Sequence, residues 1–310
     1  MNGSPANTSP PARFRGMMPI MPTAIDASGE IDEPSQRRLV EYCLEHGAAA
    51  IGHFGIASEF HKIGERDRRR LTEIIVDEVA GRVPVFLGIT APGVRTALDY
   101  ARLAEQQGAD LIMAGLPYVN IPNAAGAYAY YEALAAVTRL PIIIQDTPAS
   151  SQVLTAEFLT RMVAEIPGVQ HVKGEGQDFL EKTAQLLAAD GGAISVIGGA
   201  GGRHLIHMLR LGVTAFMTGT EALDLHGGAV HAFLDGDEER AADIYFQRIL
   251  PYLTFYLDYS EELLKDMLHR RGIIENPSVI APPAAAPMSA VERREFEWIL
   301  ERIRFGATEP

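Results

Sequence analysis

The chain has 310 residues, of which 47% are hydrophobic and 22% are charged, and its formal net charge at pH 7 is -13. Such a chain can bury a large core, and its acidic balance without a long basic stripe argues against a nucleic-acid or anionic-membrane partner. A single cysteine, Cys43, excludes an intramolecular disulfide and a cysteine-rich zinc site. Residues 1–14 are rich in Pro, Ser and Asn and are expected to form a flexible segment. Without an apolar leader or a run long enough to span a membrane, a cytoplasmic location is expected.

Eight short β-like runs follow one another along the chain, with amphipathic helical stretches between most of them. Most runs are continuously apolar, as expected for parallel strands that are buried on both faces. The runs are residues 17–21, 49–53, 83–88, 111–114, 142–145, 169–173, 194–197 and 214–217. Eight βα units within residues 15–221 favour an α/β fold of the closed (β/α)8 TIM-barrel type, although the pattern alone also permits an open doubly wound sheet.

Helix-terminating residues support this division. Asp32 is expected to cap a helix that has Pro34 in its first turn, and Gly47 follows the last turn of the same helix. The helix therefore fits between the first and second strands.

Residues 222–310 show helical patterns and no strand pattern. Helices are expected over 222–235, 238–257 with a kink at Pro251, and 261–271. A linker rich in Pro and Ala, residues 282–287, precedes a last helix, for which Ser289 and Glu292 form a capping-box pair. This C-terminal extension contains no cluster of chemically unusual residues and is expected to pack beside the barrel as a layer of helices.

Lys173 ends the apolar run of the sixth strand and is followed by Gly174 and Glu175. A lysine on a buried strand is costly unless it has a function or a partner. Desolvation favours the neutral amine, which is the form that condenses with a ketone as a Schiff base. The alternative is an ammonium that reaches water or pairs with Glu175, and this segment alone does not separate the two.

In a barrel, function lies at the carboxyl ends of the strands and in the loops that follow them. The second strand leads into Gly55, Ile56, Ala57 and Ser58, where small residues let backbone N–H groups approach a substrate carboxylate and Ser58 adds a hydroxyl donor. The fourth strand leads into Tyr118, which is suited to carrying or orienting a proton. Taken singly, each of these is also explained by ordinary loop chemistry, and their joint position at strand ends favours a site.

The fifth, sixth and seventh strands add further candidates at the same rim. Gln145 ends the fifth strand, and Glu175 is close enough in sequence to Lys173 to act as a general base. Gly199 belongs to the glycine run 198–202, which with Arg203 is a candidate for holding a phosphate or a substrate tail. This run has neither the spacing of a dinucleotide fingerprint nor that of a P-loop.

A metal site is not indicated. His204 and His207 share one helical face, but no carboxylate spacing completes a ligand set around them. No metal and no other cofactor is therefore expected.

At these residues the chain resembles the dihydrodipicolinate synthase and N-acetylneuraminate lyase family of (β/α)8 enzymes. The likeness covers about residues 14–280 in the order of the elements. Gly55-Ile56-Ala57-Ser58-Glu59 stands where the family has Gly-Thr-Thr-Gly-Glu, Pro117-Tyr118 matches its Pro-Tyr, and Val172-Lys173 matches the segment of its Schiff-base lysine.

Two departures from the family pattern carry information. Ile56 and Ala57 replace the hydroxyl pair, so a substrate carboxylate would depend on backbone N–H groups and on Ser58. The strand-five tyrosine, a proton shuttle in the synthase and the lyase, is Gln145 here. Because an amide cannot shuttle that proton, lysine biosynthesis and sialic acid cleavage are both disfavoured.

The segment 145–150 together with 173–175 looks most like the family branch that contains L-2-keto-3-deoxyarabonate dehydratase. That resemblance implies a Schiff base at C2 of a 2-keto-3-deoxy sugar acid, proton removal from C3 and loss of the C4 hydroxyl. Lys173 is then the nucleophile and Glu175 the acid or base, with Tyr118 and Ser58 assisting. The resemblance also implies a homotetramer. No cofactor is expected for this chemistry.

Other functions remain open at this point. A retro-aldol lyase and a deaminase pass through the same imine and enamine. A sugar-acid-binding protein that kept the barrel and lost the chemistry is a further alternative, motivated by the missing hydroxyl pair and tyrosine. A metal-dependent barrel enzyme is the last.

Overall fold

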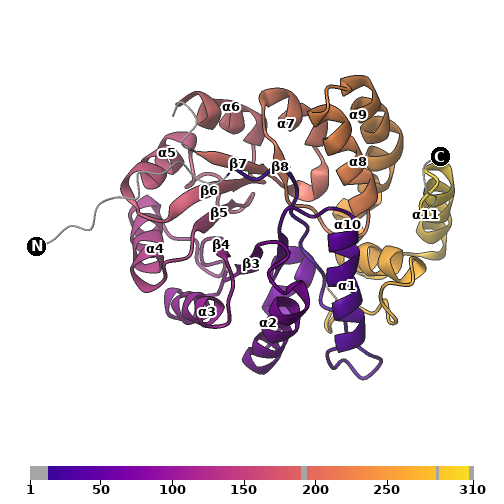
Figure 1. Cartoon of the computed structure of the whole chain (residues 1–310), viewed down its shortest axis with the longest axis horizontal. Helices are drawn as coiled ribbons and strands as arrows, with labels where there is room; N and C mark the ends of the chain where they lie inside the picture. Colours follow the sequence, from indigo (N-terminus) through magenta and orange to yellow (C-terminus); the bar gives the residue numbers. More distant parts are fainter. Residues whose placement is uncertain (1–12, 190–193, 284–285, 307–310) are drawn as a thin grey trace, which may run out of the picture.

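The computed structural model describes residues 13–189, 194–283 and 286–306, so most of the segment 1–14 lies outside the described residues. Its strands are parallel neighbours in the order β1-β8-β7-β6-β5-β4-β3-β2, with helices around them (Figure 1). The strands are β1 (Gly16–Met17), β2 (Ile51–His53), β3 (Val85–Gly88), β4 (Leu111–Ala114), β5 (Ile142–Asp146), β6 (Val169–Gly174), β7 (Ser195–Gly198) and β8 (Ala215–Phe216).

The two ends of this strand order are joined, which closes the sheet into a barrel. The N–H of Ala49 donates to the carbonyl of Met17 over 2.7 Å, and the N–H of Gly52 donates to the carbonyl of Pro19 over 2.9 Å. The predicted (β/α)8 barrel is therefore confirmed. The first strand is shorter than predicted because Pro19 has no N–H to donate to β2, yet Ile20 still donates to the carbonyl of Thr218.

The helices alternate with the strands as predicted. They are α1 (Glu33–Glu45), α2 (Glu65–Val79), α3 (Val94–Gln106), α4 (Ala124–Val137), α5 (Ala156–Glu165), α6 (Phe179–Ala189), α7 (Leu205–Leu211) and α8 (Leu223–Leu234). The predicted cap of α1 is present, since the side chain of Asp32 accepts from the N–H of Ser35 over 3.1 Å. Because α8 packs against β1, it completes the eighth βα unit.

Two apolar layers fill the fold. One lies between the strands and the helices, and the smaller one fills the interior of the barrel with side chains such as Phe86 and Met113. A Cβ at Gly52 would lie 2.0 Å from the ring of Phe86, so this ring occupies the space above the glycine. The barrel is therefore packed with side chains like other barrels of this type, and the space for a ligand is at its carboxyl-terminal rim.

The C-terminal extension is helical, as expected, and gathers on one side of the barrel beside α8 and α1 (Figure 1). It consists of α9 (Glu238–Ile244), the π-turn η4 (Tyr245–Ile249), α10 (Leu250–Arg270) and α11 (Ala290–Arg302). The π-turn ends two residues before Pro251, where the sequence predicts a kink. Tyr259 has non-helical dihedral angles where the sequence predicts a break. Ser289 and Glu292 form the predicted capping box.

A buried ion network connects α10 to the loop after β2, where the 3-10 turns η1 (Ile56–Ser58) and η2 (Phe60–Lys62) lie. The carboxylate of Glu59 pairs with Lys265 of α10 over 2.6 Å and with Lys62 over 3.1 Å. Lys62 also pairs with Glu261 of α10 over 2.7 Å. The extension is thereby fixed against the rim of the barrel.

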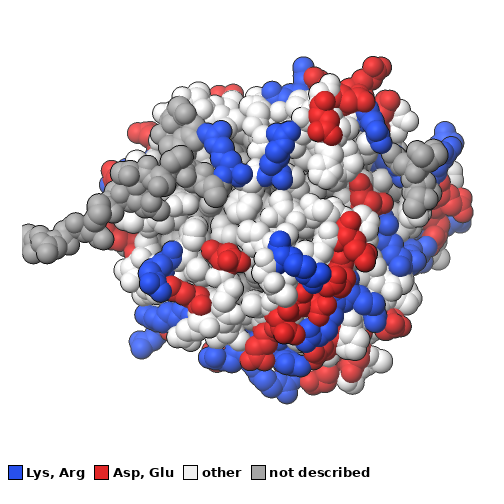
Figure 2. Space-filling view, in the orientation of Figure 1, with Lys and Arg blue, Asp and Glu red and all other residues white. Residues whose placement is uncertain are grey.

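The surface carries charges of both signs. Figure 2 shows basic and acidic side chains interspersed over α1 and α2, where Arg37 pairs with Asp77 and Glu78. Among the described residues, no helix is long and apolar enough for a membrane crossing.

Candidate active site

Lys173 lies near the end of β6 with 4% of its surface exposed, and its amine reaches a cavity of about 270 Å³ at the carboxyl-terminal rim. Its Nζ is 3.0 Å from Oε1 of Glu175, which borders the same cavity. The sequence left open whether Lys173 has a function at a site or pairs with Glu175. The structure shows the ion pair and also places the lysine at a cavity. This arrangement gives an amine access to a bound ketone with a carboxylate beside it.

The carboxylate of Glu175 is held at both oxygens. Gln145 on the neighbouring strand donates its amide to Oε2 over 2.7 Å, and the backbone N–H of Ala200 donates to Oε1 over 2.9 Å. Burial alone would raise the pKa of Glu175, but the charge of Lys173 and the bonds from Gln145 and Ala200 lower it below its ordinary value. Glu175 is therefore ionised at neutral pH and suited to accept a proton.

Gly199 follows β7 and packs directly against Glu175. A Cβ at this position would lie 2.4 Å from Cγ of Glu175, so a side chain here would displace the carboxylate. The glycine run after β7 is predicted to bind substrate, and the contact found for Gly199 is with Glu175. Its role in binding substrate stays a prediction.

The loop after β2 contributes one wall of the cavity. The side chains of Ile56 and Ala57 line it, together with residues from several other strands and from α10. Ser58 is fully buried, and its hydroxyl donates to the carbonyl of Met21 over 2.6 Å. Gly55 packs against Ile20, whose atoms would lie 2.9 Å from a Cβ on the glycine. The roles predicted for Gly55 and Ser58 in substrate binding therefore stay predictions.

Tyr118 lies at the rim but is not among the residues that line this cavity. It is 44% exposed, and its ring meets Phe60 edge-on with 5.9 Å between the ring centroids. Burial and the neighbouring Tyr100 raise the pKa of its phenol above the usual value. A catalytic role for Tyr118 stays a prediction.

Sequence reasoning did not assign a role to Asp146, the last residue of β5. Its carbonyl accepts the N–H of Glu175 over 3.0 Å, and its buried carboxylate pairs with Lys182 of α6 over 2.6 Å. Burial raises the pKa of Asp146 to about 6, against the lowering effect of Lys182. The pair fixes the segment that carries Glu175. The signal in the sequence that could have identified this residue was an aspartate directly after Gln145, at the end of a strand predicted to be buried.

The helix α10 was expected to be part of a packing layer, yet four of its residues line the cavity: Tyr256, Leu257, Ser260 and Glu261. The sequence contained no motif that predicts this contact. The cavity is thus shared between the strand ends and the C-terminal extension.

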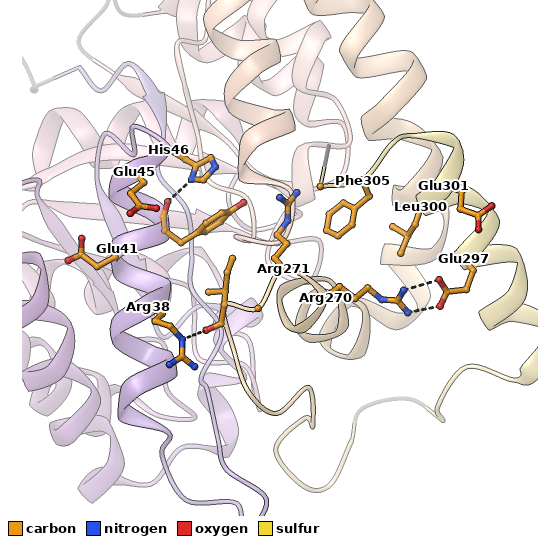
Figure 3. Close-up of a pocket in the computed structure, with 14 residues that line it drawn as sticks. Arg38, Glu41, Glu45, His46, Arg270, Arg271, Glu297, Leu300, Glu301 and Phe305 are labelled. Carbon is orange, nitrogen blue, oxygen red and sulfur yellow. Dashed lines mark hydrogen bonds and ion pairs between the residues drawn. The ribbon is translucent and has the colours of Figure 1, made fainter. Parts of the chain in front are cut away.

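A larger hollow of about 880 Å³ lies elsewhere, between α1, the end of α10 and α11 (Figure 3). Arg271 there stacks on the ring of Phe305 at 4.2 Å and pairs with Asp224, while Arg270 pairs with Glu297. Arg38 and Glu41 of this hollow are also held in ion pairs, with Glu275 and Arg82, and Lys173 is not part of it. The smaller cavity at the strand ends is therefore the better candidate for chemistry.

Residues 13–303 match the model of the dihydrodipicolinate synthetase family. The chain belongs to this family. It is 31% identical to L-2-keto-3-deoxyarabonate dehydratase from Azospirillum brasilense over 91% of this chain and 94% of the relative. It is also 26% identical to 4-hydroxy-tetrahydrodipicolinate synthase from Leptothrix cholodnii, over 83% of this chain and 88% of the relative.

Solved structures support the fold. Dihydrodipicolinate synthase from Thermotoga maritima superimposes with a TM-score of 0.86 at 22% identity, over 95% of this chain and 100% of that chain. A prophage protein of the same family from E. coli K12, solved in complex with pyruvate, has a TM-score of 0.86 at 23% identity over the same shares. At these identities the likeness establishes the barrel. The family match establishes that the protein is a lyase of the dihydrodipicolinate synthetase family.

Proposed function

We propose that the protein is a hydro-lyase that dehydrates a 2-keto-3-deoxy sugar acid through a Schiff base on Lys173. The observation that carries this proposal is the amine of Lys173, buried at a cavity and 3.0 Å from the carboxylate of Glu175. The likeness to a sugar-acid dehydratase over 91% of the chain supports the choice of reaction.

The proposed reaction begins with attack of the Lys173 amine on C2 of the substrate, and loss of water from the adduct gives the imine. Glu175 then removes a proton from C3, and the electron pair of the broken bond forms the enamine. The enamine expels the C4 hydroxyl, which takes the proton held by Glu175 and leaves as water. Hydrolysis of the resulting unsaturated imine returns the amine of Lys173. The released unsaturated 2-keto acid tautomerises to the semialdehyde, as protons leave C5 and its hydroxyl and protons are added at C3 and C4.

The substrate carboxylate has a suitable partner in the loop after β2. In the 3-10 turn η1, the N–H groups of Ser58 and Glu59 donate to the carbonyls of Gly55 and Ile56. The N–H groups of Ile56 and Ala57 come first in this turn and donate no hydrogen bond to the described residues. Two adjacent free N–H groups beside the cavity support the carboxylate site predicted from the sequence.

The hydrogen bond from Gln145 orients Glu175 for proton transfer to and from the substrate. The Gln145 amide is bonded to the carboxylate over 2.7 Å and fixes the orientation of Oε2, while Oε1 faces Lys173. A carboxylate whose pKa is lowered, and which lies beside the nitrogen that becomes the imine, is positioned to reach C3 of an attached substrate. This geometry supports a single acid–base group for both proton transfers.

The proposal is tested by incubating the purified protein with stereochemically defined 2-keto-3-deoxypentonates and identifying the products. A semialdehyde formed without cleavage of a carbon–carbon bond is the expected product. Release of pyruvate would instead identify a retro-aldol lyase, and release of ammonia from an amino-sugar acid would identify a deaminase. Turnover that a chelator abolishes would contradict the cofactor-free mechanism. The predicted homotetramer is a separate expectation, checked by sedimentation of the purified protein.

A further inference from the structure

The helix α10 brings one phenol into the candidate active site. Tyr256 lines the cavity together with Lys173 and Glu175. A Cβ on Gly201 would lie 2.8 Å from Cε1 of Tyr256, so the ring packs against the loop after β7. The preceding residue in this loop, Ala200, donates its N–H to Glu175. Tyr256 therefore borders the peptide that holds the proposed base.

The hydroxyl of Tyr256 differs from those of the other tyrosines along the same stretch of helix. Tyr245 donates to the carbonyl of Arg203, the hydroxyl of Tyr252 is 3.1 Å from Nε2 of His226, and Tyr259 donates to Glu292. Tyr256 makes no hydrogen bond with any residue that the structure describes. Its hydroxyl is thus free to bind a ligand in the cavity.

Two other hydroxyl groups of the cavity are engaged, while that of Ser260, also on α10, forms no hydrogen bond with the described residues. Thr218 donates to the carbonyl of Gly219 over 2.9 Å, and the hydroxyl of Thr147 is 3.1 Å from that of Ser150. The proposed dehydration leaves an oxygen at C4 that gains negative charge as its bond to carbon breaks. A hydrogen-bond donor at that oxygen accelerates the step.

Resting on the proposed function, we propose that Tyr256 donates a hydrogen bond to the departing C4 hydroxyl. The bond between C4 and oxygen breaks, its electron pair goes to the oxygen, and the proton that completes water comes from Glu175. Tyr256 keeps its own proton throughout, so no further acid or base is needed. The C-terminal extension thereby supplies a catalytic residue to the barrel.

The electrostatic environment agrees with a donor role. Burial raises the pKa of Tyr256, and the charges of Glu221 and Glu175 raise it further, so the phenol stays protonated through the neutral range. A protonated phenol stabilises a leaving hydroxyl. It is unsuited to remove a proton from that hydroxyl, which a retro-aldol cleavage would require.

The test compares Tyr256→Phe with Tyr259→Phe, which removes a hydroxyl from the same helix outside the cavity. Two readouts are independent of the leaving group: reductive trapping of pyruvate on Lys173, and exchange of the C3 hydrogens of a bound 2-keto acid in D2O. The third readout is the rate of dehydration of the 2-keto-3-deoxypentonate, which includes loss of the C4 hydroxyl. Tyr256→Phe is expected to lower kcat for dehydration on the order of 100-fold, while trapping and exchange stay at the wild-type level. Tyr259→Phe is expected to match the wild type in all three.

Two results would overturn the role of Tyr256. One is an undiminished kcat in Tyr256→Phe. The other is a loss of exchange as large as the loss of kcat, which would mean that the ring merely positions Glu175. Failure of the wild-type protein to trap pyruvate would instead overturn the proposed function, and this readout does not involve Tyr256.

Discussion

Two buried lysines of this protein are each paired with a glutamate, and they serve different ends. Lys173 is 4% exposed and lies 3.0 Å from Glu175, while Lys265 is 1% exposed and lies 2.6 Å from Glu59. By burial and pairing alone, Lys265 is at least as unusual as Lys173. Burial beside a carboxylate therefore does not by itself mark a catalytic lysine.

The difference lies in what else surrounds each amine. Lys265 also donates to the carbonyl of Ser278 over 3.0 Å, and Glu59 also accepts from Lys62 and from the N–H of Ile280. This network joins the barrel loop to the C-terminal extension. Burial lowers the pKa of Lys265, so a shifted pKa would have pointed to the wrong lysine. A cavity beside the amine is what distinguishes Lys173.

The comparison predicts that Lys173→Met abolishes turnover, with a loss of at least about 10⁴-fold, because no other described amine reaches the cavity. The variant keeps its fold, since methionine fills a similar volume at the strand end and Glu175, which borders the cavity, keeps its hydrogen bonds from Gln145 and Ala200. Steady-state kinetics and thermal unfolding measure both effects. Residual turnover within tenfold of the wild type would contradict the assignment of Lys173 as the catalytic lysine.

The reciprocal variant, Lys265→Met, is expected to act on stability instead. It leaves the carboxylate of Glu59 buried with one cation fewer, which costs roughly 3–5 kcal/mol of the free energy of unfolding. Turnover per folded molecule is expected to stay within a few-fold of the wild type. Denaturant unfolding checks the first expectation, and a stable variant without activity would contradict the assignment.

Glu175→Gln separates the two halves of the catalytic pair. The substitution keeps the shape of the side chain and removes the base, so turnover is expected to fall by about 10²–10³-fold. Reductive trapping of pyruvate on Lys173 is expected to persist, because the amine is still present at the cavity. Loss of trapping together with turnover would mean that Glu175 acts on the lysine and not on the substrate.

Glu221 extends the comparison from buried lysines to buried carboxylates, because unlike Glu175 it forms no ion pair with the described residues. Burial raises its pKa to about 7, the opposite of the shift at Glu175. A raised pKa favours proton binding by the folded state, so this group's contribution to stability falls as pH rises from about 4.5 through 7. The loss amounts to roughly 3 kcal/mol.

In Glu221→Gln this decline is expected to be absent. Urea unfolding at several pH values from 4 to 8 compares the variant with the wild type. The neighbouring His226, whose pKa is lowered to about 4 by burial, titrates in both proteins and cancels in the difference. Parallel stability profiles for the two proteins would contradict the assignment.

Gly199→Ala is expected to have the smallest effect, a fall in turnover of about 10-fold. The added Cβ would lie 2.4 Å from Cγ of Glu175 and would therefore displace the carboxylate. The matched control is Gly64→Ala, where an added Cβ meets open space and φ is -72°. Equal turnover in both variants would show that the position of Glu175 tolerates displacement.

Much of the barrel follows from the sequence, because buried parallel strands are continuous apolar runs separated by amphipathic helices. The shortened first strand depends on Pro19. Lys173 and Glu175 were predictable together, since residues two apart at a strand end face one rim.

Other parts of the site depend on tertiary contacts that a linear pattern does not contain. Tyr256 reaches the cavity because α10 docks on the barrel, and that docking includes the contact between Lys265 and Glu59. Ser58 appears as a donor in the sequence, but its hydroxyl is bonded to the carbonyl of Met21.

The central claim is that the amine of Lys173 forms a covalent bond to the C2 carbon of a 2-keto acid. Reduction of the protein with borohydride in the presence of pyruvate, followed by mass spectrometry of its peptides, tests this directly. We predict a single reduced adduct on the peptide that contains Lys173, absent from Lys173→Met. No adduct, or an adduct on Lys265 or Lys182 with Lys173 unmodified, would contradict the account.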